Sequence, residues 1–380
     1  MDPGVPSAAG LMTAITMRQW YFDEAQGRYD IDLGDSYVGG SRLSDHSLPA
    51  DCLLDYGNNR GTSPLRDLVA GLYGRDPSHI GITHGGQEAL YLLYRTLLSA
   101  GDHAVVFTPG WQQAEPVLSR AGCRVDAVGT TADGRPDIAA ALGLITPRTK
   151  AVVLNSPCNP TGRRVTAAGI EGLVEALRPH GGHLVLDEEY VADLGADSWV
   201  KSYEYAVSVS SVSKVYGVPG LRVGWMCGPP ETVTRAMEYK HFTTIANSVI
   251  LERLAIGILQ HRAEHVSRYQ GLIADGLRIL ERWVARHHGT LRMWQPEGTP
   301  YAWLHTPGLP SSLDFCREVL RRERLLLMPA EVFGTENGIR LTFAREPDVL
   351  AEGLRRIDAV LDGRPTAAPG GAHPESKVQR

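Results

Sequence analysis

The stretch Ala151-Val-Val-Leu-Asn-Ser-Pro-Cys-Asn-Pro-Thr-Gly162 joins a short apolar run to a polar turn. Similar short apolar runs recur between longer helical patterns from about residue 80 to 230, at 80–83, 104–107, 184–186 and 206–209. They are nearly continuous in apolar residues rather than alternating, so we expect both faces of their sheet to be covered. This rhythm predicts an α/β fold with a parallel or mixed sheet between helices.

Past residue 230 the pattern changes to long helical stretches, the longest over 264–288, with a further helix near 312–323. Strands are expected at 301–304, 325–328 and 339–343. This region predicts a second, smaller α+β unit. The end of the chain, 363–380, is rich in Pro, Gly and charge with almost no apolar anchor, which predicts a disordered tail.

Composition excludes several classes of protein. Lys and Arg number 38 against 43 Asp and Glu, a net charge of -5, so nucleic acid is not expected as a partner. There is no apolar run of the roughly 18 to 20 residues that a membrane helix needs, and the first residues lack signal-peptide features. The five cysteines are odd in number and form no CxxC pair, so we expect reduced core residues rather than disulfides or a metal site. These features predict a cytoplasmic protein that does not bind a membrane.

One lysine stands among small residues in Ser211-Val-Ser-Lys-Val-Tyr-Gly-Val-Pro-Gly-Leu-Arg222. This setting suits Schiff-base chemistry, because the lysine amine must reach a carbonyl carbon without a bulky neighbour. Taken alone, the segment also fits an exposed loop.

Polar residues follow two of the expected strands. Asn159-Pro-Thr-Gly162 comes after one, and Asp187-Glu-Glu-Tyr190 comes after the next. Ligands bind at strand ends in open α/β sheets, so these groups should meet the lysine in one crevice. The turn Gly85-Gly-Gln87 precedes a helix and suits a phosphate. Each motif also has an ordinary structural explanation, as a turn or a helix cap.

Together these motifs resemble the class I/II aminotransferase family, fold type I enzymes that use pyridoxal 5′-phosphate (PLP), over about residues 31–362. The resemblance implies a PLP-dependent transferase-like fold: a large domain with a mainly parallel seven-stranded sheet between helices, and a smaller α+β domain. It implies an N-terminal arm (1–45) that contributes to the small domain, a large PLP-binding domain (46–270) and a small C-terminal domain (271–362).

The resemblance also implies roles for individual residues. Lys214 would hold PLP as a Schiff base and then move the substrate's α-proton. Asp187 would pair with the pyridinium nitrogen, while Tyr190 and Asn159 would hydrogen-bond the phenolic oxygen. The remaining cofactor-binding positions implied are Gly85, Gly86, Gln87, Trp111, Ser211, Ser213, Arg222 and Tyr56. Among these, Trp111 would stack on the cofactor, and most of the others would hold its phosphate. Since Tyr56 would act from the neighbouring subunit, a homodimer is implied.

For the substrate, Arg340 resembles the arginine that clamps the α-carboxylate. Asn159, Tyr37 and Gly39 are also expected to face the substrate. The acidic residues Asp30, Asp32 and Asp35 either meet a cationic side chain such as a guanidinium or belong to a solvated loop. Gln112 and the segment 297–301 depart from the family pattern, which leaves the substrate's side chain open.

The resemblance implies a PLP-dependent aminotransferase that moves the amino group of an L-amino acid to a 2-oxo acid. The alternative is a PLP-dependent lyase or cyclase of secondary metabolism, because PLP supports elimination, carbon–sulfur cleavage, decarboxylating deamination and cyclisation as well. A PLP-fold regulator without catalysis is disfavoured, since the lysine, carboxylate, phenol and arginine positions are all filled.

Overall fold

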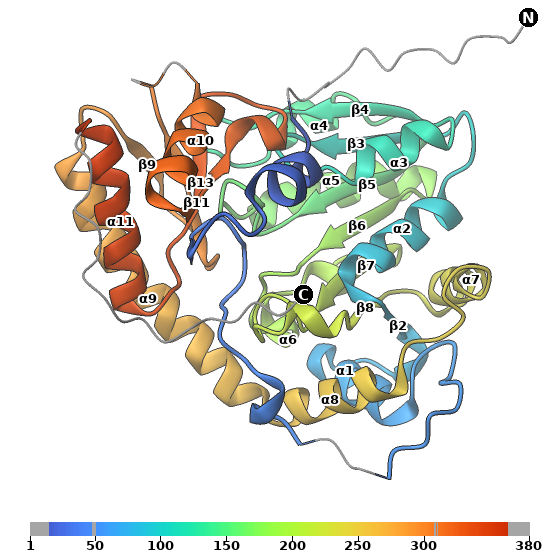
Figure 1. Cartoon of the computed structure of the whole chain (residues 1–380). Coiled ribbons are helices and arrows are strands. Elements are labelled where there is room, and N and C mark those ends of the chain that lie inside the picture. Colours follow the sequence, from blue (N-terminus) through green and yellow to red (C-terminus); the bar gives the residue numbers. More distant parts are fainter. Residues whose placement is uncertain (1–14, 48–50, 308, 310, 364–380) are drawn as a thin grey trace, which may run out of the picture.

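The computed structural model describes residues 15–47, 51–307, 309 and 311–363 of the 380-residue chain (Figure 1). The expected tail at 363–380 therefore lies, apart from its first residue, outside the described residues. The strands are β1 (Ile31–Asp32), β2 (Ile80–Thr83), β3 (His103–Phe107), β4 (Arg124–Val128), β5 (Thr149–Asn155), β6 (His183–Asp187), β7 (Ala206–Ser211), β8 (Gly224–Cys227), β9 (Arg292–Trp294), β10 (Tyr301–His305), β11 (Leu325–Leu326), β12 (Met328–Pro329) and β13 (Gly338–Thr342). The α-helices are α1 (Ser63–Tyr73), α2 (Gly85–Leu97), α3 (Ala114–Arg120), α4 (Ile138–Leu142), α5 (Ala167–Leu177), α6 (Leu194–Asp197), α7 (Pro230–Lys240), α8 (Val249–Gln260), α9 (Arg262–Arg286), α10 (Ser312–Glu323) and α11 (Pro347–Leu361).

The larger sheet has seven strands in the order β2-β8-β7-β6-β5-β3-β4. Only β8 runs antiparallel to its neighbours, β2 and β7, and every other pairing is parallel. This confirms the α/β fold with a mainly parallel seven-stranded sheet. All five strands expected between residues 80 and 209 are present, whereas β4 and β8 were not anticipated from the apolar runs.

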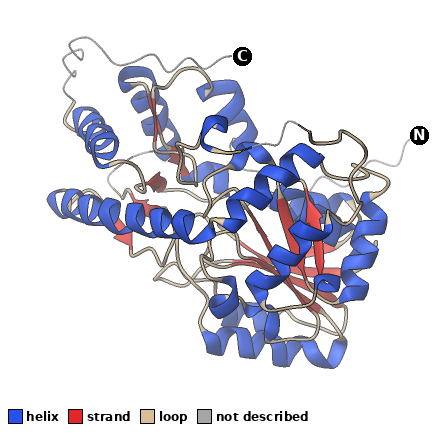
Figure 2. Ribbon diagram, turned by 90° about the horizontal axis from the view of Figure 1, so that it is seen from below, coloured by secondary structure: helices blue, strands red, loops and turns tan. Residues whose placement is uncertain are grey.

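The central strands are apolar on both faces because helices cover both. Along β5, Val152 and Leu154 join one core while Ala151 and Val153 join another. Helices α2, α3 and α7 pack on one face of the sheet, and α1 and α5 pack on the other. Figure 2 shows strands (red) with helices (blue) around them.

The second sheet is antiparallel, in the order β12-β13-β10-β9, and packs with α9, α10 and α11. Next to it, β1 pairs in parallel with β11, so the N-terminal segment lies against the C-terminal part of the chain. The continuous helix α9 extends from α8 towards α11 and passes through residue 270 (Figure 1).

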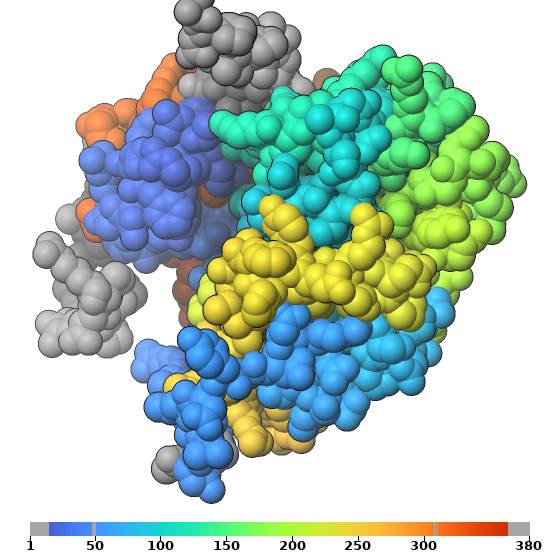
Figure 3. Space-filling model, turned by 90° about the vertical axis from the view of Figure 1, so that its right-hand side faces the viewer, coloured from blue at the N-terminus to red at the C-terminus, as the bar shows by residue number. Residues whose placement is uncertain are grey.

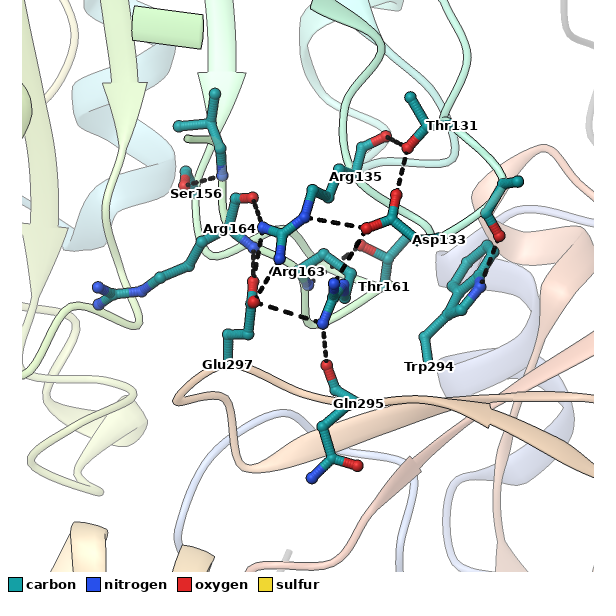
Figure 4. Close-up of polar contacts among 12 residues, drawn as sticks. Thr131, Asp133, Arg135, Ser156, Thr161, Arg163, Arg164, Trp294, Gln295 and Glu297 are labelled. Atoms are coloured by element: carbon teal, nitrogen blue, oxygen red, sulfur yellow. Dashed lines mark hydrogen bonds and ion pairs between the residues drawn. The ribbon is translucent and has the colours of Figure 1, made fainter. Parts of the chain in front are cut away.

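A polar network ties the segment before β10 to the turn after β5 (Figure 4). The carboxylate of Glu297 accepts hydrogen bonds from the guanidinium of Arg135 and from the backbone N–H of Arg164, at 2.6 Å for the latter. Asp133 accepts from Arg135 Nε and Arg163 Nη2, both at 3.0 Å. Burial acts to raise the pKa of the Glu297 carboxyl, but these hydrogen bonds outweigh it and lower the pKa.

The cysteines and the helices bear on two further expectations. Cys123, Cys158, Cys227 and Cys316 are buried as expected, but Cys52 is partly exposed and so does not belong to the core. Across the described part of the chain, no helix combines the length and apolar character needed to span a membrane.

Candidate active site

A cavity of about 380 Å³ lies between the carboxyl ends of the parallel strands and the second sheet. It brings together most of the predicted site residues, because the ends of β5, β6 and β7 meet at one edge of the sheet. The predicted residues that line it are Gly86, Gln87, Trp111, Asn159, Asp187, Tyr190, Ser213, Lys214, Arg222 and Arg340.

Lys214 lies on the loop that joins β7 to the neighbouring antiparallel strand β8. Backbone hydrogen bonds close the loop at its base, from Val212 N–H to the carbonyl of Val223 at 3.1 Å. The Lys214 Nζ donates to Ser36 Oγ at 3.0 Å, and Tyr190 OH donates to the same oxygen at 3.1 Å. Ser36 therefore joins the amine and the phenol within the cavity.

Asp187 is the last residue of β6, and its carboxylate is buried at the cavity wall. Asn155 Nδ2 and the backbone N–H of Ser156 donate to its carbonyl oxygen at 2.9 and 3.1 Å, which fixes the strand end. Burial and the negative charge of Glu189 raise the pKa of the Asp187 carboxyl to about 7. A group with a pKa near 7 in a cavity suits holding a proton for a bound ring nitrogen.

The turn at the start of α2 is built on two glycines that leave no room for side chains. Gly85 has a φ of +75°, and a Cβ there would lie 2.5 Å from Arg222 Nη2. A Cβ on Gly86 would lie 2.2 Å from Glu189 Oε1. A guanidinium therefore lies against the N-terminus of a helix beside Ser211, whose hydroxyl also points to Glu189. Arginine, hydroxyl and helix N–H groups are the donors that a phosphate prefers, so these residues fit the phosphate of PLP.

Arg340 extends from β13 and is buried between the rings of Tyr301 and Phe333, 5.2 and 5.1 Å from their centroids. Its Nη1 donates to Asn159 Oδ1 at 2.7 Å, and its Nη2 donates to the carbonyl of Gly34. Its buried Nε has no partner among the described residues. The guanidinium is thus held rigidly with donor capacity left at the edge of the cavity.

Trp111 is 40% exposed at the cavity mouth. Its indole Nε1 donates to Gln87 Oε1 at 2.7 Å, which fixes the ring relative to the first turn of α2. This orientation keeps an aromatic face available to a planar ligand.

Five of the predicted site residues lie outside the cavity lining. Gly85 and Ser211 are behind its wall, against Arg222 and Glu189. The other three are Tyr37, Gly39 and Tyr56: the first two accept hydrogen bonds at their carbonyl oxygens, and Tyr56 is 88% exposed. The roles of all five stay predictions.

The three aspartates near the N-terminus, Asp30, Asp32 and Asp35, also differ in whether they line the cavity. Asp35 lines the cavity and accepts from Tyr21 OH at 3.2 Å. Asp30 pairs with Arg356, and Asp32 accepts from the N–H groups of its own loop.

The two departures from the family pattern bind neighbouring segments instead of lining this cavity. Gln112 Oε1 accepts from the backbone N–H of Met17 at 3.1 Å. Glu297 forms the network with Arg135 and Arg164 described above.

Sequence reasoning missed three polar residues of the cavity, Tyr21, Ser36 and Glu189. Glu189 had a usable signal, since alternate residues of an extended chain point to the same side. Asp187 and Glu189 face the cavity, whereas the intervening Glu188 turns away and accepts from Ser198 and Ser208. Ser36 had no comparable signal, because its loop has no regular period.

The fold and this site define a class: a fold type I enzyme with pyridoxal 5′-phosphate as its cofactor. The chain belongs to the aminotransferase class I and II family, whose model matches residues 50–357. When bound, PLP supplies an electron sink for breaking bonds at the α-carbon of an amino acid.

Relatives carry more than one activity. The chain is 25% identical to an aspartate aminotransferase of Thermotoga maritima over 329 residues, 82% of this chain and 84% of the relative. It is 29% identical to a capreomycidine synthase of Streptomyces vinaceus over 362 residues, 91% of this chain and 92% of the relative.

The matching solved structures also include both an aminotransferase and a cyclase. A PLP-dependent aminotransferase from Streptococcus suis matches with a TM-score of 0.85 at 25% identity, covering 92% of this chain and 98% of that one. The PLP-dependent cyclase OrfR matches with a TM-score of 0.84 at 29% identity, covering 92% and 97%. These relatives therefore share the family and the cofactor, and they differ in reaction.

Proposed function

We propose that the protein is an aminotransferase that moves the amino group of an L-amino acid to a 2-oxo acid. The observation that carries the proposal is the meeting of Lys214, Asp187 and Arg340 in one cavity. The amine can move a proton, and the carboxylate with a raised pKa can pair with a protonated ring nitrogen. The buried guanidinium can bind a carboxylate.

Each of these residues has a separate role. The Lys214 amine takes the proton from the substrate's α-carbon as a general base and then gives it up again as a general acid. The hydroxyl of Ser36 holds the amine in position. Asp187 keeps the cofactor's ring nitrogen protonated, and Tyr190 and Asn159 hydrogen-bond its phenolic oxygen. Arg340 binds the substrate's α-carboxylate.

The cofactor's phosphate is assigned to the glycine turn and to the polar groups around it. These are Gly85, Gly86, Gln87, Ser211, Ser213 and Arg222, with Trp111 stacking on the ring. The contacts of Arg222 with Gly85 and the exposure of Trp111 support this assignment.

We also propose a homodimer in which Tyr56 completes the partner's site. An apolar surface supports it: Leu53, Leu54, Phe242 and Ile245 are exposed around the same face as Tyr56. Asn59 Nδ2 donates to the carbonyl of Ile245 at 2.7 Å, which joins the two segments. Figure 3 shows the chain around α1 (blue) beside α7 and α8 (yellow) on this face. Large exposed apolar patches commonly mark protein interfaces.

A lyase or cyclase is the second candidate function. The capreomycidine synthase and the cyclase OrfR, each 29% identical over more than 90% of this chain, support it. In such a reaction the Lys214 amine would still move the α-proton, but no 2-oxo acid would be needed. Asp35 supports a substrate with a positive side chain in either case, because its carboxylate lines the cavity.

One experiment separates the two reactions. The purified PLP-loaded protein is incubated with a panel of ¹⁵N-labelled amino acids, with and without a 2-oxo acid, and products are identified by mass spectrometry. Transfer of ¹⁵N to the oxo acid supports the aminotransferase. Turnover without an acceptor, with release of ammonia, a thiol or a cyclic amino acid, would replace it with the second candidate.

The domain boundaries at residues 45, 270 and 362, and the cytoplasmic location, stay predictions of the sequence.

A further inference from the structure

The carboxylate of Glu189 lies among the residues assigned to the cofactor's phosphate. Its Oε2 accepts from Ser211 Oγ at 2.6 Å, and its Oε1 lies so close to Gly86 that a Cβ there would be 2.2 Å away. Arg222 lies across the same turn, with its Nη2 2.5 Å from the position of a Cβ on Gly85. The carboxylate thus occupies donors that a phosphate would use.

The charged groups around Glu189 show what a second anion would meet there. Two cations face it, Lys214 and Arg222, and one further carboxylate, that of Asp187, lies nearby. Glu188 points to the other side of the segment, towards Ser198 and Ser208. A phosphate dianion and an ionised Glu189 would therefore share the same hydroxyl and the same helix N-terminus.

We propose that Glu189 is a residue of the cofactor site whose carboxylate holds the phosphate-binding groups until the phosphate binds. The phosphate then takes over Ser211 and the Gly86 turn, and Glu189 takes up one proton from solvent. As a neutral acid it has an O–H that donates to a phosphate oxygen, so a competing anion becomes a ligand.

The local electrostatics support this exchange. Burial raises the pKa of the Glu189 carboxyl, although the charges of Lys214 and Arg222 act in the opposite direction. A nearby phosphate would raise it further, since like charges disfavour ionisation.

The inference rests on the proposed assignment of the phosphate, so its test uses two probes that differ only in that group, PLP and pyridoxal. Dissociation constants are measured by absorbance titration of the full-length chain freed of cofactor, at pH 6.5, 7.5 and 8.5. Coupling to one proton makes the dissociation constant for PLP rise about tenfold per pH unit above the pKa of Glu189.

In Glu189→Gln this contribution to the slope should be absent, so the ratio of the wild-type to the variant dissociation constant for PLP should rise between pH 6.5 and 8.5, by up to tenfold per pH unit. The variant's affinity for pyridoxal should equal that of the wild type. Glu188→Gln is the matched control, because it removes the neighbouring carboxylate that faces away, and it should keep the wild-type slope.

Equal slopes for PLP in the wild type and Glu189→Gln would overturn the inference. If instead PLP and pyridoxal bind the wild type equally well, the phosphate assignment itself has failed. The wild type gives an independent test if the variant does not fold: sulfate, which stays a dianion at pH 8, should bind with uptake of close to one proton by the protein, measured by calorimetry in buffers of different ionisation enthalpy. Binding without proton uptake would contradict the proposal.

Discussion

Replacing Arg340 by alanine tests the assignment of the substrate's α-carboxylate most directly. Arg340 is 2% exposed, and its guanidinium is fixed by Asn159 Oδ1 at 2.7 Å and by the carbonyl of Gly34. A charge-assisted contact of this kind contributes about 2 to 4 kcal/mol to substrate binding. The variant should therefore lose roughly 30- to 900-fold in kcat/KM for the amino acid, mainly through KM.

The amine obtained by removing the α-carboxylate from the same substrate provides the internal comparison. Its turnover should be equally slow in the wild type and in Arg340→Ala, because it has no carboxylate to bind. Arg355→Ala, which removes an exposed arginine on α11, should leave kcat/KM within about twofold.

A stability measurement must accompany the kinetics. Arg340→Ala leaves Asn159 and the Gly34 carbonyl without their donor, at a cost of about 1 to 3 kcal/mol in the free energy of unfolding for each group. Urea unfolding reports this loss, and kinetics are measured where the variant is folded. An unchanged KM for the amino acid in a folded variant would refute the carboxylate assignment.

Four further predictions follow from the site and its surroundings. Lys214→Ala should still bind PLP in a titration but lose amino-acid turnover by several orders of magnitude, and turnover at the wild-type rate would exclude Lys214 as the proton carrier. In the cofactor-free chain, the raised pKa of Asp187 should lower the free energy of unfolding as pH rises from about 4 to 7, because the folded state retains a proton that the unfolded state releases. The melting temperature of Asp187→Asn relative to the wild type should therefore rise across this range, and a constant difference would contradict this prediction. Glu297→Gln should lower the free energy of unfolding by about 1 kcal/mol at pH 7, because it loses contacts with Arg135. This loss should become smaller in 1 M salt and below pH 4.5, where the carboxyl becomes protonated. A loss that does not depend on salt or pH would place its cause outside this network. Tyr56→Phe should weaken PLP binding in a protein that sediments as a dimer, and a fully active 41.4 kDa monomer would contradict the shared site.

The parallel strands were predictable because burial on both faces leaves a strong signal in sequence. The central residues of β5 (151–154) and β6 (184–186) are all apolar, and polar residues stand on both sides of each run. β4 is an edge strand whose residues are exposed or half-buried over most of its length. Its sequence, Arg-Val-Asp-Ala-Val, therefore has no continuous apolar run that would indicate a buried strand. β8 was hidden because its residues, Gly224 to Cys227, directly follow the glycine-rich loop and were read with it.

The site was predictable where chemistry restricts the residue type and unpredictable where only side-chain direction matters. The spacing between Asp187 and Tyr190, and between Lys214 and Arg222, was visible in the chain, and these residues line one cavity. Ser36 reaches Lys214 across 178 positions of sequence, and nothing local in its loop predicts that contact.

The antiparallel strand β8 also determines when the seven-stranded sheet can be completed during synthesis. Among the strands of the described residues, β2 pairs with β8 alone, and their register joins Ile80 to Cys227. A nascent chain must therefore carry β2 unpaired until residue 227 has left the ribosome, with the edge of β7 open as well. Since Gly85 follows β2 and Arg222 precedes β8, the two meet only at that late step. Fragments that end before β8 would expose strand edges prone to aggregation, so nascent chains of this length are the ones expected to need a chaperone.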